Sequence, residues 1–130
     1  GMKMPNGGKP LNFVRSVPAR GSRNVSPAIR TITLFFDKNV VNNAVWTNNR
    51  NQIRMFRGST RVAIRVTRIP DTVDMTQRRK IFVRPVNRLR ANTRYTIVIG
   101  RNLKSKAGET LGETVRVSFT TGANGIIPAE

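Results

Sequence analysis

The sequence contains neither cysteine nor histidine. Without cysteine, the chain forms neither a disulfide bond nor a thiolate metal site. Without histidine, it lacks the commonest general base, the commonest zinc ligand and the usual titrating group near neutral pH. Hydrolysis would then need a carboxylate pair or a serine–lysine arrangement, and no such carboxylate pair is evident. We therefore predict a protein that is not an enzyme and holds no cofactor.

Acidic residues are scarce, and 6 Asp and Glu stand against 24 Lys and Arg, for a net charge of +18. Such a charge attracts polyanions, among them nucleic acid, anionic membranes and acidic cell-wall polymers. The basic residues are spread along the chain rather than gathered in a block, which argues against a basic tail. Two alternatives stay open: an ordinary solvated surface, and deliberate supercharging of a less basic parent.

The few acids offer little to a metal ion. Asp71 and Asp74 lie three residues apart beside a proline. Calcium takes six to eight oxygen ligands, which is more than two acids in a strongly positive field supply. We therefore predict no metal site, and a turn-capping role for Asp71.

Long apolar runs are also missing. No run approaches the ~20 apolar residues of a membrane helix, so we expect no integral membrane segment. Residues 1–8 contain no hydrophobic stretch of the kind found in signal peptides. This absence leaves a cytoplasmic location open as an alternative.

The clearest pattern lies at residues 89–99, where a polar turn leads into a strand. Tyr95, Ile97 and Ile99 fall on one face of that strand, because side chains alternate along an extended chain. A tyrosine that enters a strand just after a tight corner is typical of Ig-type sandwiches. Its ring packs in the core, and its hydroxyl bonds to backbone a few residues upstream. We predict this corner for Tyr95.

Alternating apolar residues and turn signals predict six further strands, at 12–18, 29–37, 53–56, 60–69, 80–86 and 113–121. The Asn-rich stretch 38–52 predicts a short helical turn in which Trp46 covers one end of the core. The predicted fold is therefore an all-β, Ig-like or fibronectin-III-like sandwich of about seven antiparallel strands in two sheets. We expect one domain at 12–121, a loose N-terminal arm at 1–11 and a C-terminal tail at 122–130.

Several short motifs occur in order along the chain. They are Val25-Ser26-Pro27, Phe36-Asp37-Lys38-Asn39-Val40, Asn92-Thr93-Arg94-Tyr95-Thr96, Leu103-Lys104-Ser105 with Gly108 and Leu111, and Phe119-Thr120-Thr121. As a set they resemble the bacterial Ig-like domains of the surface-layer type, over about residues 14–121. The chain departs from that pattern at 90–92, where the family often has Pro-Gly, and in its high arginine content.

The resemblance implies a module that spaces, displays or adheres on bacterial surface proteins, with no catalytic residue to carry over. The leading prediction is therefore a structural, spacer or adhesion module, located on the cell surface or secreted. A protein or a cell-envelope polymer is its expected partner, and the chain is expected to be a monomer. The alternative is a polyanion-binding domain, with non-specific nucleic-acid binding at low salt.

Two surfaces are candidate binding sites. If the strands of Ile53, Val62, Tyr95 and Val115 share a sheet, five arginines point outward from it and could bind phosphates or carboxylates through guanidinium forks. These are Arg54, Arg61, Arg65, Arg94 and Arg116. Routine alternation with arginine at solvent positions is the other interpretation.

On the opposite sheet, Phe35 and Phe82 are predicted to point outward from neighbouring strands. They could form a cross-strand pair beneath a loop, or a docking patch for a partner or a second copy. No aromatic platform interleaves with the basic residues, and no recognition helix is evident. Sequence-specific recognition of nucleic acid is therefore not expected.

Overall fold

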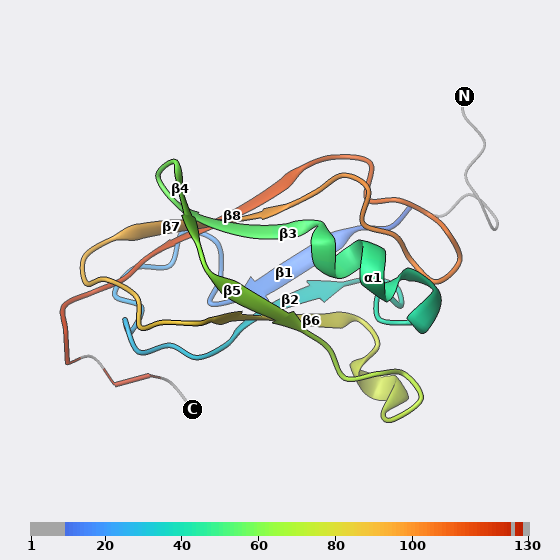
Figure 1. Ribbon diagram of the computed structural model, residues 1–130, viewed down its shortest axis with the longest axis horizontal. Helices are drawn as coiled ribbons and strands as arrows, with labels where there is room; N and C mark the ends of the chain where they lie inside the picture. The colour runs from blue at the N-terminus through green and yellow to red at the C-terminus, as the bar shows by residue number, and fades with distance from the viewer. Residues whose placement is uncertain (1–9, 126, 129–130) are drawn as a thin grey trace.

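The computed structural model describes residues 10–125 and 127–128, and it consists of two four-stranded antiparallel sheets packed on each other (Figure 1). The first sheet has the order β1 (Phe13–Val17), β2 (Ile32–Phe36), β6 (Lys80–Pro85), β5 (Ile64–Thr67). The second has the order β4 (Thr60–Val62), β3 (Ile53–Arg57), β7 (Arg94–Ile99), β8 (Val115–Thr120). This confirms the predicted all-β sandwich.

The core lies between the two sheets and is built from the alternating apolar residues of each strand. In β2, Ile32, Leu34 and Phe36 are buried while their neighbours are half-buried. The ring of Tyr95 in β7 stacks on that of Phe119 in β8, with the centroids 6.0 Å apart. Burial of such apolar surface is the main favourable contribution to folding.

The tyrosine corner forms as predicted. Tyr95 is 1% exposed, and its hydroxyl oxygen accepts a hydrogen bond from the backbone N–H of Arg90 at 2.8 Å. Asn92 takes a positive φ of 50° in the turn before the strand, a conformation that asparagine tolerates better than most residues. The corner therefore ties the 90–93 turn to the core.

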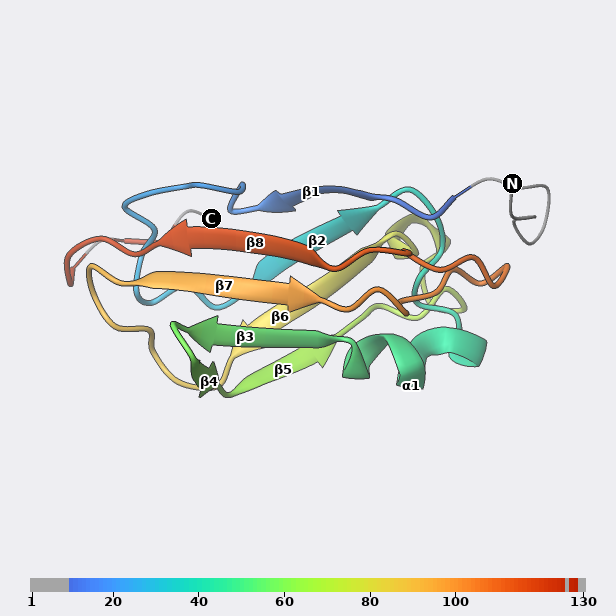
Figure 2. The same cartoon turned by 90° about the horizontal axis from the view of Figure 1, so that it is seen from above.

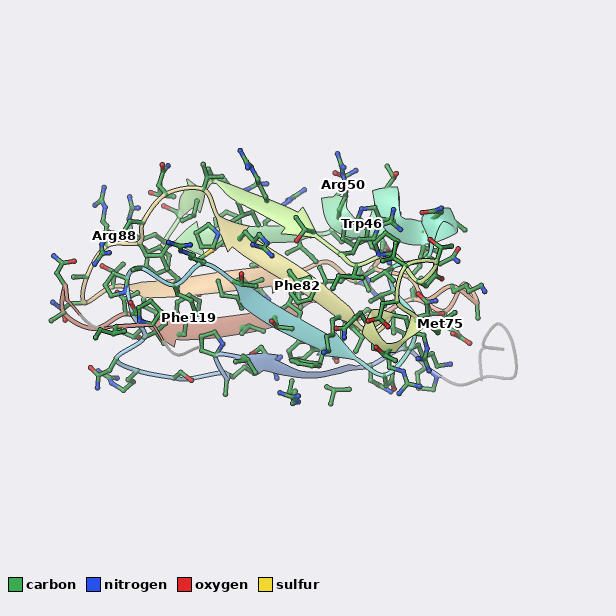
Figure 3. The ribbon with its side chains drawn as sticks, turned by 90° about the horizontal axis from the view of Figure 1, so that it is seen from below. Trp46, Arg50, Met75, Phe82, Arg88 and Phe119 are labelled. Atoms are coloured by element: carbon green, nitrogen blue, oxygen red, sulfur yellow. The ribbon has the colours of Figure 1, made fainter. Side chains whose placement is uncertain are left out.

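The Asn-rich stretch forms helix α1 (Asn43–Asn51), and a short 3-10 helix, η1 (Met75–Gln77), precedes β6. The Asn42 side chain caps α1 by accepting from the backbone N–H of Ala44 at 3.0 Å. Trp46 of α1 belongs to the core cluster and covers its end, and Figure 3 shows it at the α1 end of the sandwich. The predicted helical turn and the predicted position of Trp46 are both confirmed.

The predicted strand at 60–69 is wrong, because the chain changes sheets within it. Residues 60–62 pair with β3 in the second sheet, and residues 64–67 pair with β6 in the first. Ala63 lies exposed between the two strands. The alternation of Val62, Ile64 and Val66 is the same on both sides of this switch, so the pattern gave no sign of it. Eight strands result instead of seven.

The chain enters and leaves the sandwich at opposite ends. The start of β1 lies at one end of the sandwich, and the finish of β8 lies at the opposite end (Figure 2). Leu11 is already buried in the core, and Gly122 is buried after β8. The predicted N-terminal arm falls mainly on residues 1–9, outside the described residues. No helix in the described part of the chain is long and apolar enough to cross a membrane.

Candidate functional site

Four of the five predicted arginines share one surface, the outer face of the second sheet. Arg54 in β3 pairs with Val98, which in turn pairs with Arg116 in β8. Arg61 in β4 and Arg94 in β7 are exposed on the same face. Arg54, Arg94 and Arg116 are each next to buried residues in their strands, and Arg61 is next to the half-buried Val62, as the sequence pattern predicted. We call Arg54, Arg61, Arg94 and Arg116 the arginine face.

Arg65 does not belong to the arginine face, which corrects its predicted position. It lies on β5, in the first sheet, because the chain changes sheets at Ala63. It nevertheless lies close to two members of the face, since β4 leads directly into β5 at the edge where the sheets meet. A hollow of about 570 Å³ at this edge is lined by Arg54 and Arg61 from one sheet, Arg65 from the other and Arg50 from α1.

A second hollow, of about 420 Å³, lies on the other side of Arg65. Four arginines line it: Arg65, its direct cross-strand partner Arg84, and Arg30 and Arg88 from loops. Arg65 therefore lines both hollows. We call the two hollows together the arginine groove.

The groove holds a concentration of unpaired positive charge. Within the described residues, none of its arginine side chains makes a hydrogen bond or an ion pair, and no carboxylate lines either hollow. All seven arginines are exposed to solvent. The Arg61 guanidinium lies 5.8 Å from the ring centroid of Phe56, on the outer face of β3. The groove can therefore accept anionic groups without first breaking internal ion pairs.

Two acids in the connection between β5 and β6, in contrast, are held by hydrogen bonds. The Asp71 carboxylate is buried and accepts hydrogen bonds from the side-chain amides of Asn42 and Asn39, both at 2.9 Å. These bonds lower the pKa of Asp71, with the Asn42 bond as the larger cause. Asp74 caps η1 through Thr76, and this bonding lowers the pKa of Asp74. The described residues contain no cluster of three or more potential metal ligands.

Glu109 forms the one ion pair found among the described residues. Its side chain is 1% exposed and accepts a hydrogen bond from the Ser105 hydroxyl. The Lys38 ammonium nitrogen lies 3.2 Å from its other carboxylate oxygen. The Ser105 bond is the largest cause of a lowered pKa for Glu109, and Lys38 adds to it. This pair ties the 103–111 hairpin to the end of β2.

Phe35 and Phe82 lie on the neighbouring strands β2 and β6, as predicted, but not directly opposite each other. The register places Phe82 against Thr33 and Phe35 against Lys80. The Arg15 guanidinium lies 3.7 Å from the ring centroid of Phe35, and the Lys80 ammonium 5.5 Å from it. Two cations therefore lie over the Phe35 ring. Such contacts contribute about 0.5–1 kcal/mol at exposed sites.

The sequence matches the family described as bacterial Ig-like domain over residues 8–121. The chain belongs to the bacterial Ig-like domain family. Among the curated proteins, none matches it significantly.

Among the solved structures similar to this Ig-like domain are parts of the bacterial S-layer protein SbsC. The N-terminal part of that protein is 16% identical with a TM-score of 0.59, covering 88% of this chain. The structure of its residues 31–844 is 17% identical with a TM-score of 0.60, covering 94%. Because these identities are low, the likeness supports the fold alone. The Ig-like domain spans only 24% and 15% of those two chains.

Sequence reasoning missed four arginines of the groove in this Ig-like domain: Arg30, Arg50, Arg84 and Arg88. The outward position of Arg84 could have been found, because it alternates with the buried Val83 on β6. Arg30 and Arg88 lie in loops, where no periodicity indicates direction. Arg50 lies on α1, and only the packing of that helix against β3 brings it to the groove.

Proposed function

We propose that this Ig-like domain serves as a non-enzymatic structural or adhesive module of a bacterial cell-surface protein. The observation that carries the proposal is that the chain enters and leaves at opposite ends of the sandwich (Figure 2). This arrangement suits a unit joined in series with others, because neighbouring domains would not compete for one end.

Two further observations support the proposal. The chain belongs to the bacterial Ig-like domain family, and the S-layer protein structures that share its fold are several times longer than this chain. In addition, the buried polar side chains are engaged in structural contacts. Asn49, Asp71 and Glu109 each bond to backbone or side chains of another segment.

Surface labelling tests the location. We expect an antibody against this domain to label intact cells of the bacterium that produces it, and added protease to remove the label without lysis. An antibody against a cytoplasmic protein of the same cells serves as the control for lysis. Labelling that appears only after permeabilisation would contradict the proposal.

Polyanion binding is a second candidate function, favoured by the clustering of the arginines. Four predicted arginines share the arginine face, and the fifth joins two of them in the groove. We expect saturable retention on heparin at physiological ionic strength, where purely diffuse attraction is largely screened. Replacing Arg54, Arg61, Arg65, Arg94 and Arg116 with glutamine should abolish this retention. Unchanged retention at fixed salt would contradict it.

Self-association through the Phe35 and Phe82 surface is the third interaction to consider, with a monomer as the expected state. The cations over Phe35 already reduce its exposed apolar area. We expect light scattering to give the monomer mass across a concentration series. A mass that rises with concentration, and falls back in the Phe82→Ser variant, would instead establish a docking patch.

A further inference from the structure

We propose that the arginine groove is a binding track for a linear phosphate polymer without aromatic bases, held through its phosphate groups. The inference rests on the polyanion-binding function proposed above and assigns it to a particular site. It differs from the arginine face in its residues: Arg94 and Arg116 belong only to the face, whereas Arg65 and Arg84 belong only to the groove.

The track follows β5. Arg65 on β5 lines both hollows, which have volumes of about 570 and 420 Å³. Figure 3 shows Arg50 on α1 and Arg88 toward the other end of the sandwich, with β5 between them. Positive charge therefore extends along the molecule across both hollows. An extended polymer would match this shape better than a single small anion.

The pairing of Arg65 with Arg84 is the strongest sign of a phosphate site. The two residues are directly opposite each other on antiparallel strands, where side chains start about 4.5–5.5 Å apart and like charges destabilise the sheet. Nothing in the described residues neutralises them. A phosphate group directs its oxygens to several sides, so one phosphate can accept hydrogen bonds from both guanidinium groups. One guanidinium fork, in contrast, already satisfies a planar carboxylate.

The apolar lining of the groove indicates that bases are not recognised. The apolar side chains beside the arginines are aliphatic: Ala28, Ile29, Ile53, Ile64, Val66, Pro85 and Val86. No aromatic ring lines either hollow. Proteins that bind single-stranded nucleic acid use aromatic rings as stacking platforms for the bases. The groove offers contacts to the charged backbone of a polymer and none of this kind to bases.

Edge protection accounts for only part of the groove. Charged residues on short edge strands prevent pairing with other chains, and β4 and β5 are edge strands with three and four residues. This function explains Arg61 and Arg65. It does not explain Arg30 and Arg88, which lie in loops outside the edge strands and line the same hollow.

The experiment compares two double variants of equal charge in the full chain. R65Q/R84Q removes the central pair of the groove, and R94Q/R116Q removes the same charge from the arginine face. The probe is medium-chain inorganic polyphosphate, with oligothymidylate and polyglutamate of similar charge as comparison polymers. Affinity is measured by calorimetry at several salt concentrations, including physiological ionic strength.

Log affinity for polyphosphate should fall as log salt concentration rises. We expect R65Q/R84Q to make this slope less steep by roughly 1.5, corresponding to two lost phosphate contacts at about 0.7–0.9 each. R94Q/R116Q should leave the slope close to that of the wild type. Polyphosphate should also bind more tightly than the other two polymers. As a second readout, polyphosphate should raise the melting temperature of R94Q/R116Q more than that of R65Q/R84Q.

Equal loss of affinity in the two variants would overturn the track while leaving polyanion binding in place. Tighter binding of oligothymidylate would overturn the assignment to a polymer without bases, and equal binding of polyglutamate would overturn the preference for phosphate. Failure of the wild-type protein to bind any of the three polymers at physiological ionic strength would overturn both the track and the polyanion-binding function.

Discussion

The buried acids and the groove arginines of this molecule differ in their surroundings: the buried acids are hydrogen-bonded by neighbouring groups, and the groove arginines are open to solvent. Around α1, η1 and the 103–111 hairpin, which lie at one end of the sandwich (Figure 1), Asp71 and Glu109 are buried and hydrogen-bonded. Along β5, the arginines of the groove are exposed and have no carboxylate beside them.

This difference follows from the sizes and costs of the groups. A short carboxylate at a strand end is buried by the surrounding loops, so it must be hydrogen-bonded to avoid a large desolvation cost. Arginine is long, and its guanidinium stays in water while its stem covers apolar surface. The buried acids therefore stabilise the fold, whereas the groove arginines are available for binding.

The largest expected loss of stability is in the Asn49→Ala variant, at the end of the sandwich that holds Asp71 and Glu109. Asn49 is 0% exposed, donates to the carbonyls of Val40 and Lys104 at 2.8 Å, and accepts from the Lys104 N–H at 2.9 Å. Loss of these bonds leaves buried backbone groups unpaired, so the free energy of unfolding should fall by about 3 kcal/mol. Chemical denaturation measures this. The control, Asn51→Ala on the same helix, should change little, and equal losses would contradict the prediction.

Tyr95→Phe tests whether a buried hydrogen bond also stabilises the fold at the opposite end of the sandwich, where the tyrosine corner lies. The hydroxyl is the acceptor for the Arg90 N–H, and its removal leaves that donor unpaired while the ring still packs on Phe119. We expect the free energy of unfolding to fall by about 1–3 kcal/mol, measured by the same denaturation. No measurable loss would show that the corner bond does not stabilise the fold.

Glu109→Gln tests the ion pair and its dependence on pH. The pKa of Glu109 is lowered from its ordinary value of 4.5, so the unfolded chain takes up a proton at higher pH than the folded one. The resulting stabilisation is present above about pH 4.5 and is lost as the pH falls through the lowered value. We expect the variant to be less stable than the wild type by about 1–2 kcal/mol at neutral pH.

Melting temperatures measured from pH 7 to pH 3 follow this difference, which should shrink toward acid pH. Glu113→Gln, at an exposed position, is the control and should remain close to the wild type throughout. A difference between Glu109→Gln and the wild type that stays constant with pH would mean that the charge of Glu109 contributes nothing.

The smallest expected effect has the opposite sign. Without any ligand, R65Q/R84Q removes a directly opposed like-charge pair, so the free energy of unfolding should rise by about 0.2–1 kcal/mol at low salt. Added salt should reduce this gain because it screens exposed charges. R94Q/R116Q is again the matched control. A loss of stability in R65Q/R84Q would mean that these arginines have a structural function.

Local patterns carried most of the fold prediction. The corner at Tyr95, the alternation in β2 and β8, and the position of Trp46 each depend on residues close in sequence, and all agree with the structure. The prediction for Arg65 failed for a physical reason. Alternation tells which residues share a face of one strand, but not when the chain crosses to another sheet.

By itself, the sequence determined the β-sandwich, the family and the excess of positive charge. It also excluded thiol and imidazole chemistry, because those side chains are absent. Only the tertiary structure decided where the charge gathers. The arginine groove combines arginines from loops, a helix and both sheets. They are Arg30 and Arg88 from loops, Arg50 from α1, Arg65 and Arg84 from the first sheet, and Arg54 and Arg61 from the second. Their proximity depends on how the sheets pack and on where the chain crosses between them. Local periodicity in the sequence indicates neither the packing nor the crossing point.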